Sequence, residues 1–208
     1  MNRLDNFINE CDIALKTLSF KKSGTGRSYP ANKTSSSLSK EEKSLSAQLM
    51  RVNLAGEVAA QALYRGQAMV CKDAEIKNHL MQAGEEETDH LIWCKKRLEE
   101  LNGKPSILNP VWYAGSFAIG AIFGSFGEKT SLGFVEETEK QVVKHLEKHL
   151  DKVSKNDAET IEILKTMRAD EDEHAQEAID NGSESLSEPT KKVMSFTAKV
   201  MTSSSAYI

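Results

Sequence analysis

The chain has 208 residues, a formal net charge of -4, 28% charged residues and only 6% aromatic residues. This length suits a single domain with a sizeable core, and abundant charges with few aromatics favour a helical protein over a β-sandwich. No basic cluster is present, so nucleic acid is not an expected partner. The N-terminus has an early Asp5 and no apolar run, and it does not resemble a signal peptide.

The spacing of apolar residues predicts helices along the first half of the chain. A short amphipathic helix is expected over residues 2–19, followed by a flexible loop over 21–38 that is rich in Ser, Thr, Gly and Lys. A long helix is predicted from Ser39, a helix-capping residue followed by acids, to about residue 71. A second long helix is predicted over about 74–101, where Asn-Gly and then proline end it.

The second half begins with residues 105–127, a run without any charged side chain. Three more helices are predicted over about 133–153, 157–179 and 187–203. Short links make each consecutive pair of long helices an antiparallel hairpin, and the long middle connection joins the two hairpins. The sequence therefore predicts an all-α single domain over 1–208, a ferritin-like four-helix bundle with one crossover and additional helices at the N-terminus, crossover and C-terminus.

Two Glu-x-x-His pairs are the main chemical signal in the sequence. Among five histidines, only His90 and His174 have a glutamate three residues earlier, Glu87 and Glu171. Residues three apart on a helix lie on nearly the same face, so a carboxylate and an imidazole can reach one metal ion. The same interval separates the two glutamates and the two histidines, as two similar hairpins would give. The other histidines are expected on solvated helix surfaces: His79, His145 and His149.

A two-metal site needs further carboxylates from the partner helix of each hairpin. Glu57 is a lone acid among small and apolar residues, which favours a buried, paired charge. In the third long helix, spacing alone leaves Glu136 and Glu137 as alternatives. Such an oxygen-rich site with two imidazoles suits iron or manganese. Asp170 and Glu86 are placed to accept hydrogen bonds from the outer nitrogens of the two histidines.

Several stretches together resemble the signature of the demethoxyubiquinone hydroxylase family, di-iron monooxygenases of ubiquinone biosynthesis. They include Asn53-Leu54-Ala55-Gly56-Glu57 and Glu86-Glu87-Thr88-Asp89-His90, and they cover nearly the whole chain: residues 51–67, 86–93, 114–120, 133–139, 167–175 and 199–202. The resemblance implies six metal ligands and so favours Glu136 over Glu137: Glu57, Glu87, His90, Glu136, Glu171 and His174. It also implies that Glu87 and Glu171 bridge two iron ions.

The activity implied by the resemblance is hydroxylation of the demethoxy ring position of a polyprenyl quinol, with dioxygen as co-substrate. No Rossmann-type glycine fingerprint is present, so electrons would come from the quinol itself, from NAD(P)H bound without that motif, or from a partner protein. One departure is Leu54, which stands where the family has histidine. Leu54 is not at an expected iron-ligand position, so the metal centre should be retained. A leucine cannot, however, play the polar role near the substrate that a histidine could.

The implied substrate is extremely apolar, so the uncharged run 105–127 is also a candidate for contact with the membrane. We expect this crossover to dip into one leaflet rather than to span the bilayer, because a spanning helix would separate the two ligand hairpins. The protein is then expected at the cytoplasmic face of the inner cell membrane, as a peripheral protein near other ubiquinone-biosynthesis proteins. The alternative is an ordinary buried crossover helix. Gly120 and Gly124 fit close helix packing, including self-association into a homo-oligomer.

Two other classes use the same features. A ferritin-like iron-storage or peroxide-scavenging protein would carry the same ligands but would not need an exposed apolar crossover. A helical scaffold would carry no metal at all. The sequence therefore predicts a di-iron hydroxylase, with iron storage as the alternative function.

Overall fold

The computed structural model describes residues 3–31 and 37–208. Within these residues all regular structure is helical, which confirms the predicted fold class. The helices run in this order: α1 (Arg3–Leu18), α2 (Lys40–Val70), α3 (Ala74–Glu100), α4 (Asn109–Ser125), α5 (Glu128–Lys152), α6 (Ala158–Asp180) and α7 (Glu188–Ser205). Most bounds fall close to the predicted ones. Part of the predicted loop, 32–36, lies outside the described residues.

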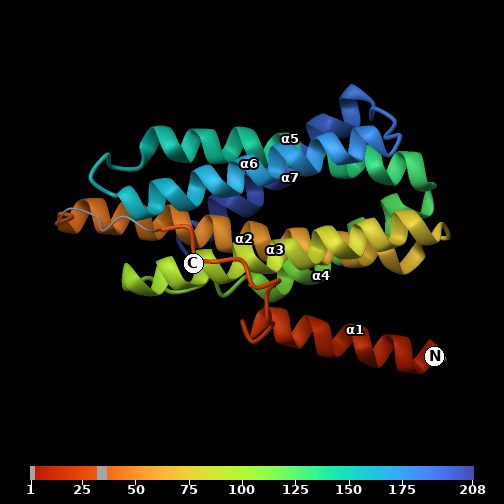
Figure 1. The fold of residues 1–208 in the computed structure, drawn as a ribbon, viewed down its shortest axis with the longest axis horizontal. Coiled ribbons are helices and arrows are strands. Elements are labelled where there is room, and N and C mark those ends of the chain that lie inside the picture. Colours follow the sequence, from red (N-terminus) through yellow and green to blue (C-terminus); the bar gives the residue numbers. More distant parts are fainter. Residues whose placement is uncertain (1–2, 32–36) are drawn as a thin grey trace.

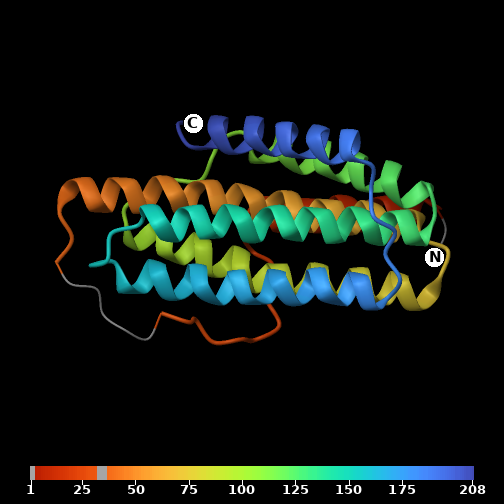
Figure 2. The same ribbon diagram turned by 90° about the horizontal axis from the view of Figure 1, so that it is seen from above.

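Four long helices form the bundle that carries the candidate site. α2 and α3 pack as one hairpin and α5 and α6 as the other, while α3 also contacts α6 across the bundle. Figures 1 and 2 show these four helices side by side, with α4 lying against α2 and leading from the first hairpin to the second. This is the ferritin-like topology with one crossover that the sequence predicts.

Local capping explains where the long helices begin. Ser39 caps α2 in a capping box, in which its hydroxyl accepts from the Glu42 amide and the Glu42 carboxylate accepts from the Ser39 amide. Asp73 and Asp157 cap α3 and α6 with their carboxylates. Each cap fixes the residue at which its helix begins. The starting residue in turn helps to set which face of the helix, including the ligand-bearing one, points into the bundle.

The start of α5 differs from the prediction, since it begins at Glu128 rather than at residue 133. The chain turns at Gly127, whose φ of 105° is a conformation that glycine adopts without strain. Gly133 lies inside the helix instead. A Cβ built there would be 1.9 Å from the carbonyl oxygen of Glu184, so this glycine serves close packing and not a turn.

The crossover helix α4 has two different faces. Its inner face packs on α2 through glycines: a Cβ on Gly120 would be 2.2 Å from the carbonyl oxygen of Leu63, and one on Gly66 would be 2.2 Å from that of Phe117. Its outer face is open, and Val111 is 58% exposed. Trp112 donates to the hydroxyl of Ser205 on α7 at 3.0 Å, and in Figure 2 α4 and α7 lie along the same long side of the bundle. Across residues 3–31 and 37–208, every helix is too short or too polar to cross a bilayer.

Candidate metal centre

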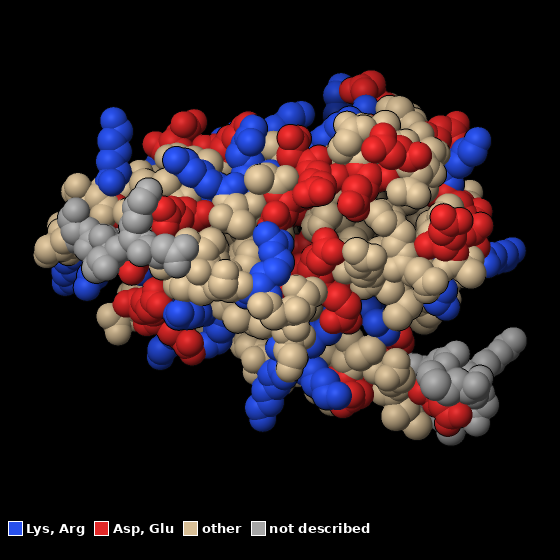
Figure 3. Space-filling model, in the orientation of Figure 1, with Lys and Arg blue, Asp and Glu red and all other residues tan. Residues whose placement is uncertain are grey.

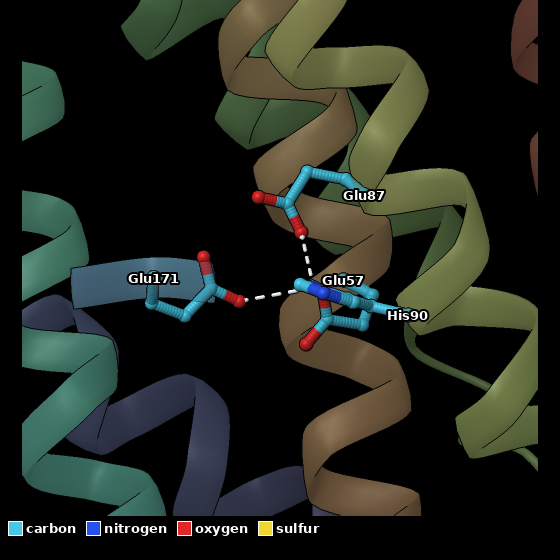
Figure 4. A group of neighbouring side chains, drawn as sticks. All are labelled: Glu57, Glu87, His90 and Glu171. Carbon is cyan, nitrogen blue, oxygen red and sulfur yellow. Dashed lines mark hydrogen bonds and ion pairs between the residues drawn. The ribbon is translucent and has the colours of Figure 1, made fainter. Parts of the chain in front are cut away.

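Helices from both hairpins bring buried acids and a histidine to one point in the bundle. Glu57 comes from α2, Glu87 and His90 from α3, and Glu171 from α6. One ligand atom of each lies within 4.8 Å of the others, and all four side chains are buried. In Figure 4 the carboxylates of Glu87 and Glu171 point at the imidazole of His90 from two sides.

Glu87 and Glu171 each contact both histidines, one oxygen to each. Nδ1 of His90 lies 3.1 Å from Oε2 of Glu87 and 3.1 Å from Oε1 of Glu171. Nδ1 of His174 lies 3.3 Å from the other oxygen of each glutamate. Glu57 lies on the His90 side, with 3.7 Å between Oε2 and Nδ1. A pair of carboxylates shared between two imidazoles is the arrangement expected of ligands that bridge two metal ions.

The outer nitrogens of both histidines face carboxylates. Nε2 of His90 donates to Oδ2 of Asp170 at 2.8 Å, and Nε2 of His174 donates to Oε2 of Glu86 at 2.9 Å. Because a carboxylate only accepts, these contacts leave both Nδ1 atoms directed at the cluster. The sequence-based expectation that Asp170 and Glu86 accept these hydrogen bonds is confirmed.

The predicted ligand Glu136 is not brought to this cluster. Its carboxylate forms ion pairs and hydrogen bonds on the outside of α5, with Lys140 and with the hydroxyl of Ser183, and 16% of its side chain is exposed. Those partners hold the pKa of Glu136 below its ordinary value even though burial acts in the opposite direction. The alternative, Glu137, accepts from Gln141 and faces Lys191, also away from the centre.

One helical turn later, Glu139 occupies the inward position on α5. It is only 2% exposed, and the phenol of Tyr64 donates to its Oε1 at 2.8 Å. Burial, followed by the nearby charges of Glu171 and Glu87, raises the pKa of Glu139 well above its ordinary value. Glu139, which the sequence pattern does not single out, therefore lies beside Glu87 and Glu171, where a carboxylate from α5 would be available to a second ion.

The donor set fits cations of the hard or borderline class. The bundle buries four carboxylates in one region: Glu57, Glu87, Glu139 and Glu171. Oε1 of Glu87 accepts no well-aligned hydrogen bond, and its neighbour is Nδ1 of His174 at 3.3 Å. Burial raises the pKa of Glu57, and the glutamates raise the pKa of His90 against the effect of its own burial. Bound cations would compete with protons for such carboxylate and imidazole groups. Carboxylates with two imidazoles suit iron or manganese.

Two other expectations have clear outcomes. Leu54 is fully buried in the main core cluster, where its side chain packs among apolar neighbours. The prediction of a solvated histidine at position 149 is wrong: His149 is 5% exposed, and its ring contacts that of His145 in a tilted arrangement with 4.0 Å between the centroids. Burial lowers the pKa of His149 to about 2. The neutral imidazole thus behaves as part of the α5 packing face.

Comparisons with known proteins agree on one family. Residues 44–205 match the family model described as ubiquinone biosynthesis protein COQ7. A protein of Legionella pneumophila (strain Lens) named 3-demethoxyubiquinol 3-hydroxylase is 49% identical over 99% of this chain and 97% of its own length. Proteins with the same name from Francisella philomiragia and Nitrosococcus oceani are 49% and 46% identical, over 96% and 100% of this chain and 94% and 98% of their own lengths.

Proposed function

The chain belongs to the ubiquinone biosynthesis protein COQ7 family, and we propose that it hydroxylates the ring of a demethoxyubiquinol, as its relatives' names state of them. The observation that carries the proposal is the pair of buried carboxylates, Glu87 and Glu171, that each contact both His90 and His174. A shared pair of this kind is typical of a two-metal oxidation centre. Iron storage, the alternative function, draws no support from these relatives.

We propose that two iron ions bind between the hairpins. Glu57 and His90 would hold one ion, Glu139 and His174 the other, and Glu87 with Glu171 would lie between them. When bound, the iron pair supplies dioxygen activation, with electrons from the quinol, NAD(P)H or a partner. The protein's own part is to fix the imidazoles through Asp170 and Glu86 and to keep bulk water from the buried glutamates.

We propose that the quinol ring approaches between α2 and α5. A small void of about 10 Å³ lies there, lined by Ala60, Leu63, Tyr64, Gln67, Phe134, Val135, Thr138 and Glu139. The ring of Phe134 stacks at 4.1 Å on Phe123 of the apolar helix α4. This row of apolar side chains therefore connects the α4 surface with the carboxylate of Glu139. Widening of the void would admit a flat ring while its polyprenyl tail stays against α4.

The same apolar surface supports peripheral attachment to a membrane, which we propose lies at the cytoplasmic face of the inner membrane. Apolar residues are exposed on α7 as well as on α4, and Phe196 is 70% exposed. The two helices are joined by the Trp112–Ser205 hydrogen bond and lie on the same side of the bundle (Figure 2). Exposed lysines, Lys192 and Lys199, flank them and suit anionic headgroups. A helix that lies in the interface needs this combination of apolar and basic side chains.

Flotation of the holoprotein with liposomes containing anionic lipid tests the membrane proposal. Phe196→Ser is expected to weaken partitioning about tenfold, because embedding an aromatic side chain contributes roughly 1.5 kcal/mol or more. The control is Ile179→Ser on α6, which Figure 2 shows on the opposite side of the bundle from α7. Equal flotation of both variants and the wild type would contradict attachment through α7.

Lipid analysis of a strain that lacks this protein and any redundant hydroxylase tests the proposed activity. The strain is expected to accumulate the demethoxy quinone and to recover ubiquinone when the wild-type chain is supplied. Glu171→Ala is expected to fail, because it removes a carboxylate that contacts both histidines. Normal ubiquinone levels without the protein would refute the activity, and rescue by Glu171→Ala would refute the metal assignment.

A further inference from the structure

The segment that follows α1 is tied along the outside of α3. Lys22 forms an ion pair with Glu85 at 3.1 Å, and the amide of Thr25 donates to Asp89 at 3.1 Å. Further along, the Tyr29 hydroxyl donates to Glu100 at 3.1 Å. We call residues 21–31 the strap. The sequence predicts a flexible loop over 21–38, and residues 21–31 form an irregular segment with specific side-chain contacts.

The strap contacts fall on one stripe of α3. Glu85, Asp89, Trp93 and Glu100 follow one another at intervals of one or two helical turns, so they share a face. The extended stretch from Lys22 to Tyr29 reaches about 23 Å, close to the roughly 22 Å of helix between Glu85 and Glu100. The strap therefore runs parallel to α3 over its full contact length, and Figure 1 shows it passing over the bundle. Figure 3 shows, in the same orientation, acidic side chains gathered on this face of the molecule.

The strap also fits closely beside the candidate centre. A Cβ on Gly24 would be 2.0 Å from Oδ1 of Asp89, so a larger residue here would require the Asp89 carboxylate to move. Phe20, at the turn where α1 ends, has a φ of 56°, which is uncommon for a bulky residue. Its ring lies 5.5 Å from the ammonium of Lys95, a contact that holds the turn against α3.

Arg27 links the strap to the histidine of the centre. Its guanidinium contacts the Asp170 carboxylate through both terminal nitrogens: Nη2 lies 3.1 Å from Oδ1, and Nη1 lies 2.8 Å from Oδ2. Oδ2 of Asp170 is also the acceptor for Nε2 of His90. The same guanidinium lies 5.0 Å over the ring of Trp93, which in turn lies 5.3 Å from the ring of His90. Arg27 thus fixes two of the groups that orient this imidazole.

We propose that Arg27 is a positioning residue that acts through Asp170 to fix the His90 ring for metal binding. The inference rests on the proposed di-iron site and adds a segment that precedes the family-matched residues 44–205. A two-pronged guanidinium contact restrains the Asp170 carboxylate in its plane, which a single ammonium cannot do. Asp170 then presents Oδ2 to Nε2, and Nδ1 remains directed at the cluster.

The first test measures ferrous iron affinity of the full chain without oxygen, by competition with a chelator. Arg27→Ala is expected to weaken binding about tenfold, the lower end of the effect of outer-sphere partners, and Arg27→Lys to restore part of it. Arg168→Ala is the matched control, because Arg168 is equally exposed at 39% and forms an ion pair of the same 2.8 Å length with Glu147.

A second test needs no metal. Trypsin cleavage after Arg27 is expected to be several-fold faster in Asp170→Asn than in the wild type, and unchanged in the control Glu147→Gln. Iron affinity of Arg27→Ala equal to that of Arg168→Ala would overturn this inference alone, since the wild type would still bind iron. Failure of the wild type to bind iron would overturn the proposed function and this inference together.

Discussion

Replacing Glu139 with glutamine is expected to remove one iron ion from the purified protein and to lower hydroxylation by at least about a hundredfold, while Glu136→Gln leaves both near the wild-type values. Glu139 is buried beside Glu87, Glu171 and His174, whereas Glu136 pairs with Lys140 on the outside of α5. Losing a metal ligand should cost at least as much as losing an outer-sphere partner, for which 10–100-fold is usual. Metal analysis with an activity assay measures both effects.

The two variants control for each other, because both remove one charge from the same helix and differ by one turn. Thermal unfolding of the metal-free proteins separates ligand loss from misfolding. Neutralising Glu139 is expected to leave the metal-free protein folded, since burial already raises the pKa of this group. A full iron complement in Glu139→Gln together with iron loss in Glu136→Gln would restore the sequence-based assignment of Glu136.

Replacing Arg97 with methionine is expected to lower the free energy of unfolding by about 3–5 kcal/mol, the usual result of removing one partner from a buried ion pair. Arg97 joins the end of α3 to the start of α6: Nη2 donates to Oδ1 of Asp157 at 2.7 Å, and Nη1 donates to Glu159 at 2.6 Å. The side chain of Asp157 is fully buried. Arg168→Met, which breaks an exposed pair, should cost no more than about 1 kcal/mol.

At acid pH, the free energies of unfolding of Arg97→Met and of the wild type are expected to differ less than at neutral pH. Burial acts to raise the pKa of Asp157, but hydrogen bonding, including that from the Thr160 amide, and the charge of Arg97 outweigh it, so the folded-state pKa lies below the ordinary value. The associated stability is fully present above the unfolded pKa of about 3.9 and is lost as the pH falls through the lower, folded-state value. Urea unfolding between neutral pH and about pH 3 measures this. A difference that grows with acid would contradict the role of Asp157.

Much of the fold follows from the sequence because several local signals agree. Ser39, Asp73 and Asp157 each cap a long helix, and the uncharged run 105–127 separates the two hairpins. The Glu-x-x-His pairs lie on inward faces because their spacing places carboxylate and imidazole together. The predicted start of α5 at Gly133 is wrong because glycine occurs both at helix ends and at close contacts. Only the packing of Glu184 against Gly133 shows that this glycine belongs to the second kind.

The different positions of Glu136 and Glu139 have a physical origin. Three of four consecutive residues of α5 are glutamates with similar neighbours in the sequence. Only their angular positions around the helix distinguish them. The buried stripe of α5 runs through Leu132, Val135, Glu139 and Leu146, and Glu136 lies beside it. Relative to Glu171, Glu139 also has nearly the spacing that Glu57 has relative to Glu87. Comparing the two hairpins would have selected Glu139, whereas the strap contacts depend on tertiary packing and leave no periodic signal in the sequence.

The outer hydrogen bonds make the two halves of the candidate centre unequal. Asp170, behind His90, is clamped by a guanidinium, while Glu86, behind His174, accepts instead from the neutral amide of Gln82 at 3.1 Å. A carboxylate that shares its charge with arginine is a weaker electron donor to its imidazole than one that does not. In the proposed metal centre, the His174 side would therefore be the more electron-rich and the His90 side the more rigid, although the two ligand sets resemble each other.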